Sequence, residues 1–240
     1  MMSASDVKRG MLSVIVPVYN GEAHLARALE SVLSQSPASM EIIVVDDGST
    51  DGSAEVAARF RPRVDCIRQG NTGPAAARNA GLERARGEFL GFIDADDIWP
   101  SGKVDAQLGA LTKNDQLGAI LGRTRCILPD GSLDAPRFLM HLGCGLYRLA
   151  AFQVAGPFDP ELRFSEDIDW FTRAREAGIA MEMADDVTLH YRLHDGNVTR
   201  GTDVHDLGYL HLVKRSLDRR RTQAGTSVAP SLPELGGFEG

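Results

Sequence analysis

The chain has 240 residues, which suits one sizeable domain or one domain with a short tail. Hydrophobic residues make up 43% and charged residues 25%, as in an ordinary globular protein, and the formal net charge of −7 argues against a nucleic-acid partner. The three cysteines lie far apart, which argues against a disulfide framework or a zinc site and favours a reducing compartment.

Residues 1–11 form an N-terminal extension before the first predicted element. The extension lacks an apolar run of signal-peptide length, and no segment approaches the ~20 apolar residues that a membrane span needs. The sequence therefore predicts a cytoplasmic protein and leaves open a peripheral contact with the inner face of the membrane.

Strands and helices alternate through the first half of the chain. Short apolar runs that end in turn residues predict buried strands at Leu12–Val18, Glu41–Asp46, Val64–Ile67 and Glu88–Asp94. The segments between them predict a helix through Leu25 and Leu33, a short helix capped by Asp51 that carries Val56 and Phe60, and a helix from Pro74 to about Ala85. This pattern predicts an α/β, Rossmann-like three-layer fold with a mostly parallel sheet, whose ligands bind at the carboxyl ends of the strands.

The second half is less regular. It predicts helices at Ser101–Leu111, at Leu149–Val154, at Glu166–Ala177 with Ser165 as the cap, and from His205 to about Arg221. It predicts strands at Leu117–Leu121, His141–Tyr147 and Val187–Leu193. We expect residues 12–200 to form one domain, residues 201–223 a C-terminal helix, and residues 224–240, which are rich in Gly, Pro and Ser, a disordered tail.

Two carboxylates, Asp46 and Asp47, directly follow the second predicted strand, in the segment Asp46–Asp51. Asp, Gly and Ser favour turns and helix caps, so a plain turn is one interpretation. A turn does not need two acids at the mouth of a strand, however. We therefore expect Asp46 to accept a hydrogen bond from a nucleobase or a ribose.

Three carboxylates follow the fourth predicted strand, at Asp94, Asp96 and Asp97. They repel one another unless a cation neutralises them. Carboxylate oxygens suit Mg²⁺ and Mn²⁺, which keep coordination positions open for phosphate oxygens. A solvated acidic turn is the alternative, but the position at the end of an apolar strand favours a metal site.

A helix poor in bulky side chains begins at Gly73 and Pro74, within the segment Asn71–Gly81. Small residues allow such a helix to lie close to the sheet. Arg78 on this helix is a candidate phosphate ligand through charge-assisted hydrogen bonds. An exposed surface arginine is an equally good interpretation.

These segments together resemble the family 2 glycosyltransferases of the GT-A fold. Four segments match the family's pattern in order and spacing: Val14–Asn20, Val44–Gly52, Asn71–Gly81 and Phe92–Asp97. The resemblance covers Ser13 to about Thr199. It implies a nucleoside-diphosphate sugar donor, most often a UDP-sugar, a divalent cation (Mn²⁺ or Mg²⁺) and inversion at the anomeric carbon. Residues 12–100 would then bind the nucleotide-sugar and residues 101–200 the acceptor.

The resemblance also assigns roles around the nucleotide. Pro17, Tyr19 and Glu22 fall where such enzymes line the nucleotide pocket, and Asp46 would contact the base. Arg78 stays a candidate for the phosphates.

The turn after the fourth strand corresponds to the family's Asp-x-Asp motif. Asp94, Ala95 and Asp96 would contact the nucleotide-sugar and its cation, with Asp96 the more direct metal ligand and Asp97 a supporting residue. His194 begins a segment similar to a His-x-x-Asn-x-Ser/Thr stretch near the end of the family's catalytic domain. Neutral imidazole binds Mn²⁺, so His194 is a further candidate ligand, and a solvent-facing histidine is the alternative.

Glu166 and Asp167 look like the family's acidic doublet. An inverting transfer needs a carboxylate near the attacking hydroxyl, and Asp167 is the candidate base, with Glu166 beside it. The alternative is that both acids stabilise the start of a helix, whose dipole would lower their pKa. Trp170, four residues after Glu166, is expected to pack in the core rather than to stack on a sugar.

Two departures limit the resemblance. The chain has no Gln-x-x-Arg-Trp motif and no membrane helix, which favours the transfer of a single sugar over processive synthesis. The acceptor stays open among a saccharide, a lipid-linked saccharide, a peptide and a small molecule. The predicted last helix carries Lys214, Arg215 and Arg219–Arg221, which are either solvated or in contact with an anionic membrane surface or a partner protein.

Three other classes of protein share parts of this pattern. A sugar-nucleotide nucleotidyltransferase would carry a basic, Gly-rich loop after the first strand, and Tyr19–Leu25 has no Lys or Arg. A receiver-like signalling domain would end near residue 120 and would not need the acids at Asp94–Asp97 or Glu166. A catalytically inactive nucleotide-binding protein of the same fold stays open.

Overall fold

The computed structural model describes residues 7–35, 37, 39–162, 164–194 and 209–224. Residues up to Thr202 belong to one compact unit and residues from Asp203 to a second. The first unit holds the sheet and all the predicted site residues. Of the second unit the structure describes one helix, α7 (Tyr209–Ala224).

The first unit is built on a seven-stranded sheet with the order β3-β2-β1-β4-β6-β5-β7. Its strands are β1 (Lys8–Val18), β2 (Met40–Asp46), β3 (Val64–Arg68), β4 (Gly87–Phe92), β5 (Leu117–Ile127), β6 (Gly145–Arg148) and β7 (Ala180–Arg192). Strand β6 runs antiparallel to both β4 and β5, while the other neighbouring pairs are parallel. The carboxyl ends of β1, β2, β4 and β7 therefore lie at the same edge of the sheet.

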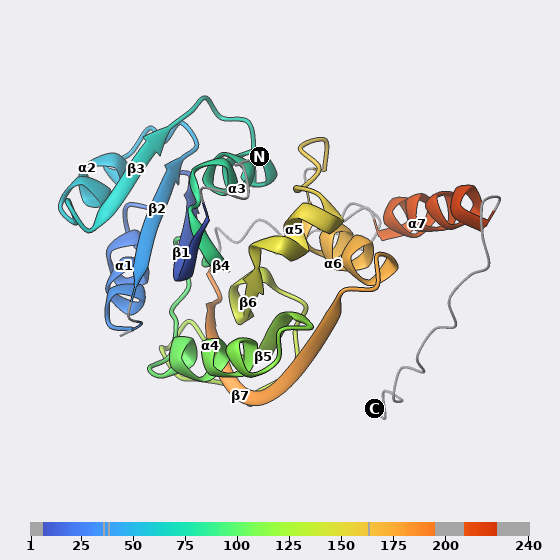
Figure 1. Cartoon of the computed structure of the whole chain (residues 1–240). Helices are drawn as coiled ribbons and strands as arrows, with labels where there is room; N and C mark the ends of the chain where they lie inside the picture. The colour runs from blue at the N-terminus through green and yellow to red at the C-terminus, as the bar shows by residue number, and fades with distance from the viewer. Residues whose placement is uncertain (1–6, 36, 38, 163, 195–208, 225–240) are drawn as a thin grey trace. The chain divides into compact units, whose positions relative to one another are not determined.

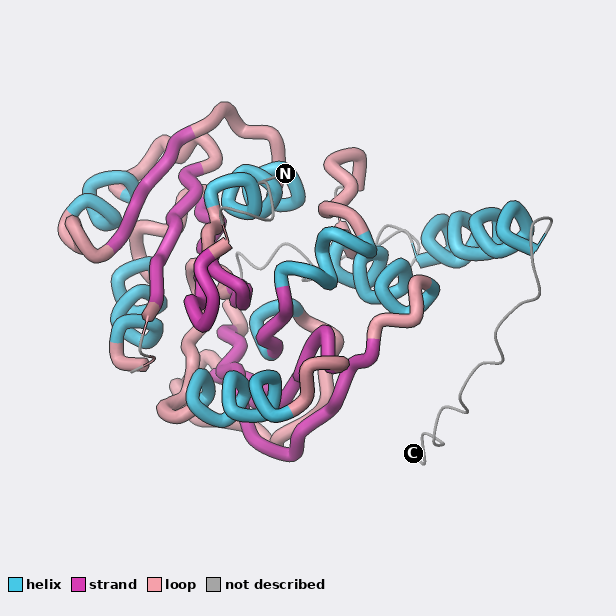
Figure 2. Tube along the Cα trace, viewed as in Figure 1, coloured by secondary structure: helices cyan, strands magenta, loops and turns pink. Residues whose placement is uncertain are grey.

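Helices cover both faces of this sheet. They are α1 (Leu25–Leu33), α2 (Ser53–Ala58), α3 (Pro74–Arg84), α4 (Lys103–Lys113), α5 (Leu149–Ala155) and α6 (Glu166–Glu176), with one 3₁₀ turn, η2 (Leu142–Cys144). Figure 1 shows α1 and α2 on one side of β1–β3 and α3 on the other. Helix and strand alternate along the chain through β4 (Figure 2), which confirms the predicted α/β fold with three layers.

The central strands carry long apolar runs because both faces of the sheet are covered. In β1, Leu12 and Val14–Val16 are fully buried. Helix α3 lies close to this strand because Gly81 has no Cβ: a Cβ there would collide with the Ile15 side chain. The small residues of α3 thus set its distance from the sheet, as the sequence predicted.

An aromatic core fixes the position of α6. Trp170 is fully buried and stacks on Phe152 of α5 with ring centroids 4.2 Å apart, and its edge meets Tyr147 of β6 at 5.4 Å. Trp170 therefore packs in the core, as predicted. Because residues four apart share a face of a helix, this packing also turns Glu166 inward.

Of the two predicted helix caps, one differs from the structure in position, and the other has the predicted position without a capping bond. Gly52 is the N-cap of α2, one residue after the predicted Asp51, although the Asp51 carboxylate still accepts from Ser53 N at 3.0 Å. Phe60 lies beyond this helix. Ser165 does occupy the N-cap of α6, but its left-handed backbone (φ 61°) makes no side-chain capping bond, which normally needs an extended N-cap residue.

Several strands begin or end at other residues than predicted, because contacts with distant segments set their ends. Strand β4 ends at Phe92, two residues early, because Asp94 O accepts from Asp97 N and closes a turn. The predicted strand His141–Tyr147 is instead the turn η2 followed by β6. Strands β5 and β7 are longer than predicted because they pair with each other over most of their length.

The C-terminal predictions are tested only in part. Helix α7 spans Tyr209–Ala224, close to the predicted range, while residues 205–208 and 225–240 lie outside the described residues. Among the helices that the structure describes, none combines the length and apolarity required to cross a membrane.

Candidate active site

The loops after β1 and β2 hold each other in place at the carboxyl edge of the sheet. Asn20, in a left-handed conformation (φ 52°), donates from its N to Ser49 Oγ at 3.0 Å and accepts from Thr50 N at 2.8 Å. Glu22 accepts from Gly52 N at 3.0 Å. This bracing gives the edge a defined shape, although residues far apart in sequence form it.

The residues predicted to line a nucleotide pocket lie at this edge. Pro17 is near the end of β1, and Tyr19 follows the strand with half of its surface exposed. Asp46 ends β2, is almost fully buried, accepts from Ser49 N at 2.8 Å and lies 3.5 Å from Arg68 Nε. Asp46 ends β2 and Tyr19 directly follows the neighbouring parallel strand β1, so both lie at the same edge of the sheet, where the Tyr19 ring is half exposed.

Asp47 has a structural role instead. Its carboxylate accepts from the backbone N of Thr72 (2.9 Å) and of Gly73 (2.8 Å). These bonds tie the loop after β2 to the start of α3. The second acid of the pair therefore places the helix that carries Arg78.

Arg78 joins two of the predicted acidic segments. Its guanidinium is buried and donates to Asp94 Oδ1 at 2.6 Å and, through its other terminal nitrogen, to Glu166 Oε1. Burial by itself would lower the pKa of Arg78, but the charges of Asp94 and Glu166 raise it. The interpretation of Arg78 as an exposed surface arginine was wrong, because its side chain links the turn after β4 to α6.

The turn after β4 separates its acids into different environments. Burial would raise the pKa of Asp94, but Arg78 and His141 outweigh it and hold that pKa well below its ordinary value. Asp97 is fully buried, and this burial, together with the charges of Asp96 and Asp94, raises its pKa. Asp97 Oδ1 accepts from Arg192 N at 3.0 Å, and its buried Oδ2 has no hydrogen-bond partner among the residues that the structure describes.

Asp96 points to a different neighbour. Its Oδ2 lies 2.8 Å from His194 Nε2, and both side chains are about a quarter to a third exposed. Arg192, just before His194, donates from Nε to Asp96 O at 3.1 Å. The structure thus brings the predicted residues Asp96 and His194 together, because β4 and β7 end at the same edge. Residues 195–199 of the His194 segment lie outside the described residues.

Asp167 has the environment of a proton acceptor. Burial, followed by the charge of Glu166, raises its pKa to about 6, against the opposing charges of His141 and Arg78. The expectation that the helix dipole would lower this pKa is wrong in direction, because burial is the larger effect. Glu166, by contrast, is held by Arg78.

Sequence analysis did not identify His141 as a site residue. Its Nε2 lies 3.4 Å from Asp94 Oδ2, and ligand atoms of Asp94, Asp97 and His141 all lie within 4.8 Å of one another. These are donor types that divalent cations accept. The surrounding His-Leu-Gly-Cys-Gly segment has no metal-ligand spacing, so no local signal could have identified it.

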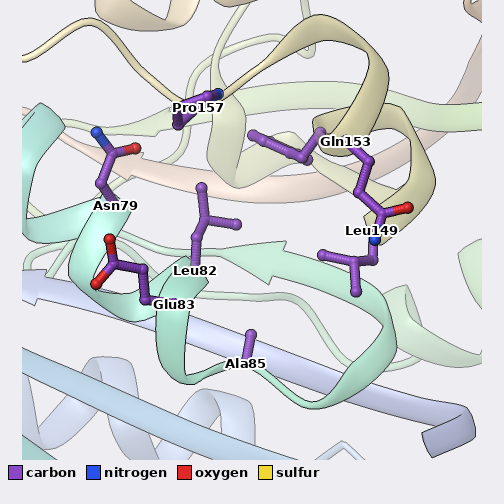
Figure 3. A pocket seen from close by; sticks show the side chains of 8 residues that line it. Asn79, Leu82, Glu83, Ala85, Leu149, Gln153 and Pro157 are labelled. Carbon is purple, nitrogen blue, oxygen red and sulfur yellow. The ribbon is translucent and has the colours of Figure 1, made fainter. Parts of the chain in front are cut away.

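A separate cavity lies between α3 and α5 (Figure 3). It has a volume of about 200 Å³ and is lined by Asn79, Leu82, Glu83, Ala85, Leu149, Phe152, Gln153 and Pro157. None of these is a predicted site residue. Asn79 does tie α3 to the turn before α6, since its side chain exchanges hydrogen bonds with the backbone of Phe158 at 2.8 and 2.9 Å.

The chain is similar to known glycosyltransferases. The family model described as Glycosyl transferase family 2 matches residues 13–156. An uncharacterized glycosyltransferase of Rickettsia prowazekii is 29% identical over 211 residues, which cover 79% of this chain and 66% of that protein. Chondroitin synthase of Pasteurella multocida is 26% identical over 228 residues, 88% of this chain and 24% of the synthase. The chain spans 66% or less of the length of these relatives.

Solved structures share the fold. S. aureus TarS 1-349 in complex with UDP-GlcNAc gives a TM-score of 0.71 at 22% identity, over 85% of this chain and 65% of that one. The same TarS fragment in complex with UDP gives a TM-score of 0.67 at 21% identity, over 88% of this chain and 72% of that one. At these identities the likeness establishes the GT-A-like fold alone.

Proposed function

Because the chain belongs to glycosyl transferase family 2, we propose that it transfers a single sugar from a UDP-sugar to an acceptor hydroxyl, with inversion at the anomeric carbon. The choice of UDP is supported by the TarS structures, which hold UDP and UDP-GlcNAc in the same fold. We assign residues 12–100 to nucleotide-sugar binding and residues 101–200 to acceptor binding.

One observation carries the proposal: the buried Arg78 holds the Asp94 carboxylate with one terminal nitrogen and the Glu166 carboxylate with the other. This contact keeps the Asp-x-Asp turn next to the first turn of α6. A donor diphosphate bound at the turn would then have its anomeric carbon close to Asp167. Both reaction partners would meet there, as an in-line displacement requires.

In this proposal Asp167 is the general base. The acceptor hydroxyl attacks the anomeric carbon, its proton passes to the Asp167 carboxylate, and the bond from that carbon to the nucleoside diphosphate breaks. A pKa of about 6 suits this role, because the carboxylate is ionised at neutral pH yet binds a proton more tightly than an ordinary aspartate. Glu166, held by Arg78, positions the start of α6 instead of accepting the proton.

We propose that Asp96 and His194 hold a divalent cation, Mn²⁺ or Mg²⁺. Their carboxylate oxygen and imidazole nitrogen lie 2.8 Å apart, are partly exposed and are donor types that Mn²⁺ accepts. The chemistry that such a cation supplies when bound is neutralisation of the charge on the leaving diphosphate. Pro17, Tyr19 and Asp46 would hold the nucleoside.

The test is a screen of UDP-, GDP- and dTDP-sugars with and without Mn²⁺. We expect Mn²⁺-dependent release of UDP. Asp96→Ala should remove the metal-dependent donor binding, with Asp105→Ala, an exposed acid on α4, as the control. Asp167→Asn should keep donor binding and stop transfer. Unchanged transfer by this variant would place the base elsewhere.

The same screen separates the alternatives. A nucleotidyltransferase would consume a nucleoside triphosphate and a sugar phosphate and release pyrophosphate. An inactive protein would bind UDP without turnover of any donor. The acceptor (saccharide, lipid-linked saccharide, peptide or small molecule) would be identified by supplying each class together with the donor that passes the screen.

The basic residues of α7 support a contact outside the catalytic unit. Exposed Lys214, Arg220 and Arg221 lie on the same helix as the exposed Val213 and Leu217. This combination suits an anionic membrane surface, which attracts basic side chains and accepts apolar ones. We propose this contact and a cytoplasmic location for the protein.

A further inference from the structure

The turn that carries His141 is held by buried side chains from other parts of the sheet unit. The carbonyls of four consecutive residues, Leu142 to Gly145, each accept from a side chain. In the order of these four carbonyls, the donors are Tyr147 Oη (3.0 Å) to Leu142, Trp99 Nε1 (3.2 Å) to Gly143, both Gln107 Nε2 (2.9 Å) and Thr188 Oγ1 (2.8 Å) to Cys144, and Lys103 Nζ (3.4 Å) to Gly145. All five of these side chains are buried. A turn held in this way has one conformation, since every alternative would leave buried donors without partners.

This conformation orients the His141 ring. Gly143 N donates to His141 Nδ1 at 3.1 Å, and the edge of the Tyr191 ring packs against the imidazole at a centroid distance of 5.4 Å. A backbone N–H can only donate, so Nδ1 must offer its lone pair. Neutral imidazole carries one N–H, which is then on Nε2.

The protonated nitrogen faces Asp94. His141 Nε2 lies 3.4 Å from Asp94 Oδ2, while Arg78 holds Asp94 Oδ1. Both oxygens of this carboxylate therefore face donors of the protein itself. A doubly protonated ring would keep the contact from Nε2–H to Asp94 but would lose the hydrogen bond from Gly143 N, which needs the Nδ1 lone pair.

A cation ligand would need the opposite arrangement. A histidine that binds a metal through Nε2 keeps its proton on Nδ1 and donates it to an acceptor. Here Nδ1 faces an N–H instead of an acceptor. Although His141 lies close to Asp94 and Asp97, its ring does not fit the role of a metal ligand.

We propose that His141 is a positioning residue, which holds the Asp94 carboxylate through Nε2–H and does not bind the cation. The proposal rests on the proposed function for the role of the Asp-x-Asp turn. Arg78 and His141 together fix the plane of the Asp94 carboxylate, and the cation is left to Asp96 and His194.

The first test is the tautomer of His141 in the full, metal-free chain. A long-range ¹H–¹⁵N spectrum of the ¹⁵N-labelled protein reports which ring nitrogen is protonated, and the His141 signals are those lost in His141→Gln. We expect a protonated Nε2, unchanged when Mg²⁺ and UDP are added. A neutral ring protonated at Nδ1, in either condition, would overturn the proposal whether or not the protein is a transferase.

The second test separates the two roles by substitution. His141→Phe removes both the donor and the ligand atom, while His141→Gln restores a donor. We expect Mn²⁺ affinity of His141→Phe, measured by electron paramagnetic resonance with Mn²⁺ alone, within about threefold of wild type, because the ring is not a ligand. We expect its kcat to fall by about tenfold or more, with partial recovery in His141→Gln.

A loss of Mn²⁺ affinity of about tenfold or more in His141→Phe, comparable to that of Asp96→Ala, would mean that His141 supports the cation, either as a ligand or by orienting one, and would overturn the proposal. Wild-type protein that does not bind Mn²⁺ would refute the proposed metal site, and the tautomer would still decide the role of His141. Near-UV circular dichroism checks that the variants fold. If His141→Phe does not fold, the wild-type spectrum, assigned with His141→Gln, decides the role of His141.

Discussion

Replacing Arg78 with methionine tests the contact on which the catalytic arrangement depends. The Arg78 side chain is 7% exposed and that of Glu166 10%, so the variant leaves a buried carboxylate without its cation. Removing one partner of a buried ion pair typically costs about 3–5 kcal/mol, and the second carboxylate, Asp94, is 28% exposed and adds less because water screens it. We therefore expect the free energy of unfolding to fall by about 3–5 kcal/mol.

The assay is urea denaturation followed by circular dichroism at neutral pH. Arg84→Met is the matched control, because Arg84 lies on the same helix and pairs with Asp65 at 3.4 Å with more than half of both side chains exposed. Its loss should be at most about 1 kcal/mol. Adding Glu166→Gln to Arg78→Met should recover part of the lost free energy of unfolding, since it removes the buried carboxylate charge that Arg78→Met leaves without a cation. A loss below about 1 kcal/mol for Arg78→Met would refute the reasoning.

Four further predictions concern other residues. Burial raises the pKa of Asp167 from 3.8 to about 6, so its ionised form destabilises the folded protein above pH 6. Asp167→Asn should therefore raise the free energy of unfolding by at most about 3 kcal/mol above pH 6, and this gain should vanish as the pH falls to 4. Equal unfolding curves of the variant and the wild type at pH 8 would contradict this. In the wild type, transfer should fall as the pH drops through about 6, in a pH–rate profile. Gly81→Ala in α3 should lower the free energy of unfolding by about 1–3 kcal/mol, because the added Cβ collides with Ile15. Gly109→Ala in α4, which has open space around it, should raise it by up to about 1 kcal/mol in the same urea denaturation. Charge reversal of Lys214, Arg220 and Arg221 to Glu should abolish co-sedimentation of the protein with phosphatidylserine vesicles. Equal co-sedimentation of the wild-type protein with neutral phosphatidylcholine vesicles would show that the attraction is not electrostatic.

Much of the fold could be predicted because its signals are local. The apolar runs of β1 and β2 and the Gly-Pro start of α3 are properties of a few neighbouring residues. The strands of the second half were harder to predict from the sequence, since β5 and β7 gain their length from pairing with each other. The ends of strands and helices moved wherever a turn contact, such as that between Asp94 and Asp97, stopped the element early.

The sequence by itself determined which acids lie at the carboxyl edge of a mostly parallel sheet, because the alternation of strands and helices predicts successive strands that run in the same direction. Only the tertiary structure decided which side chains those acids meet: Arg78 between Asp94 and Glu166, and His141 turned by the N–H of Gly143. The physical reason is range. Apolar periodicity and turn chemistry act over a few residues, whereas the partner of a long side chain and the pKa of a buried carboxylate depend on which distant segments come within a few ångströms.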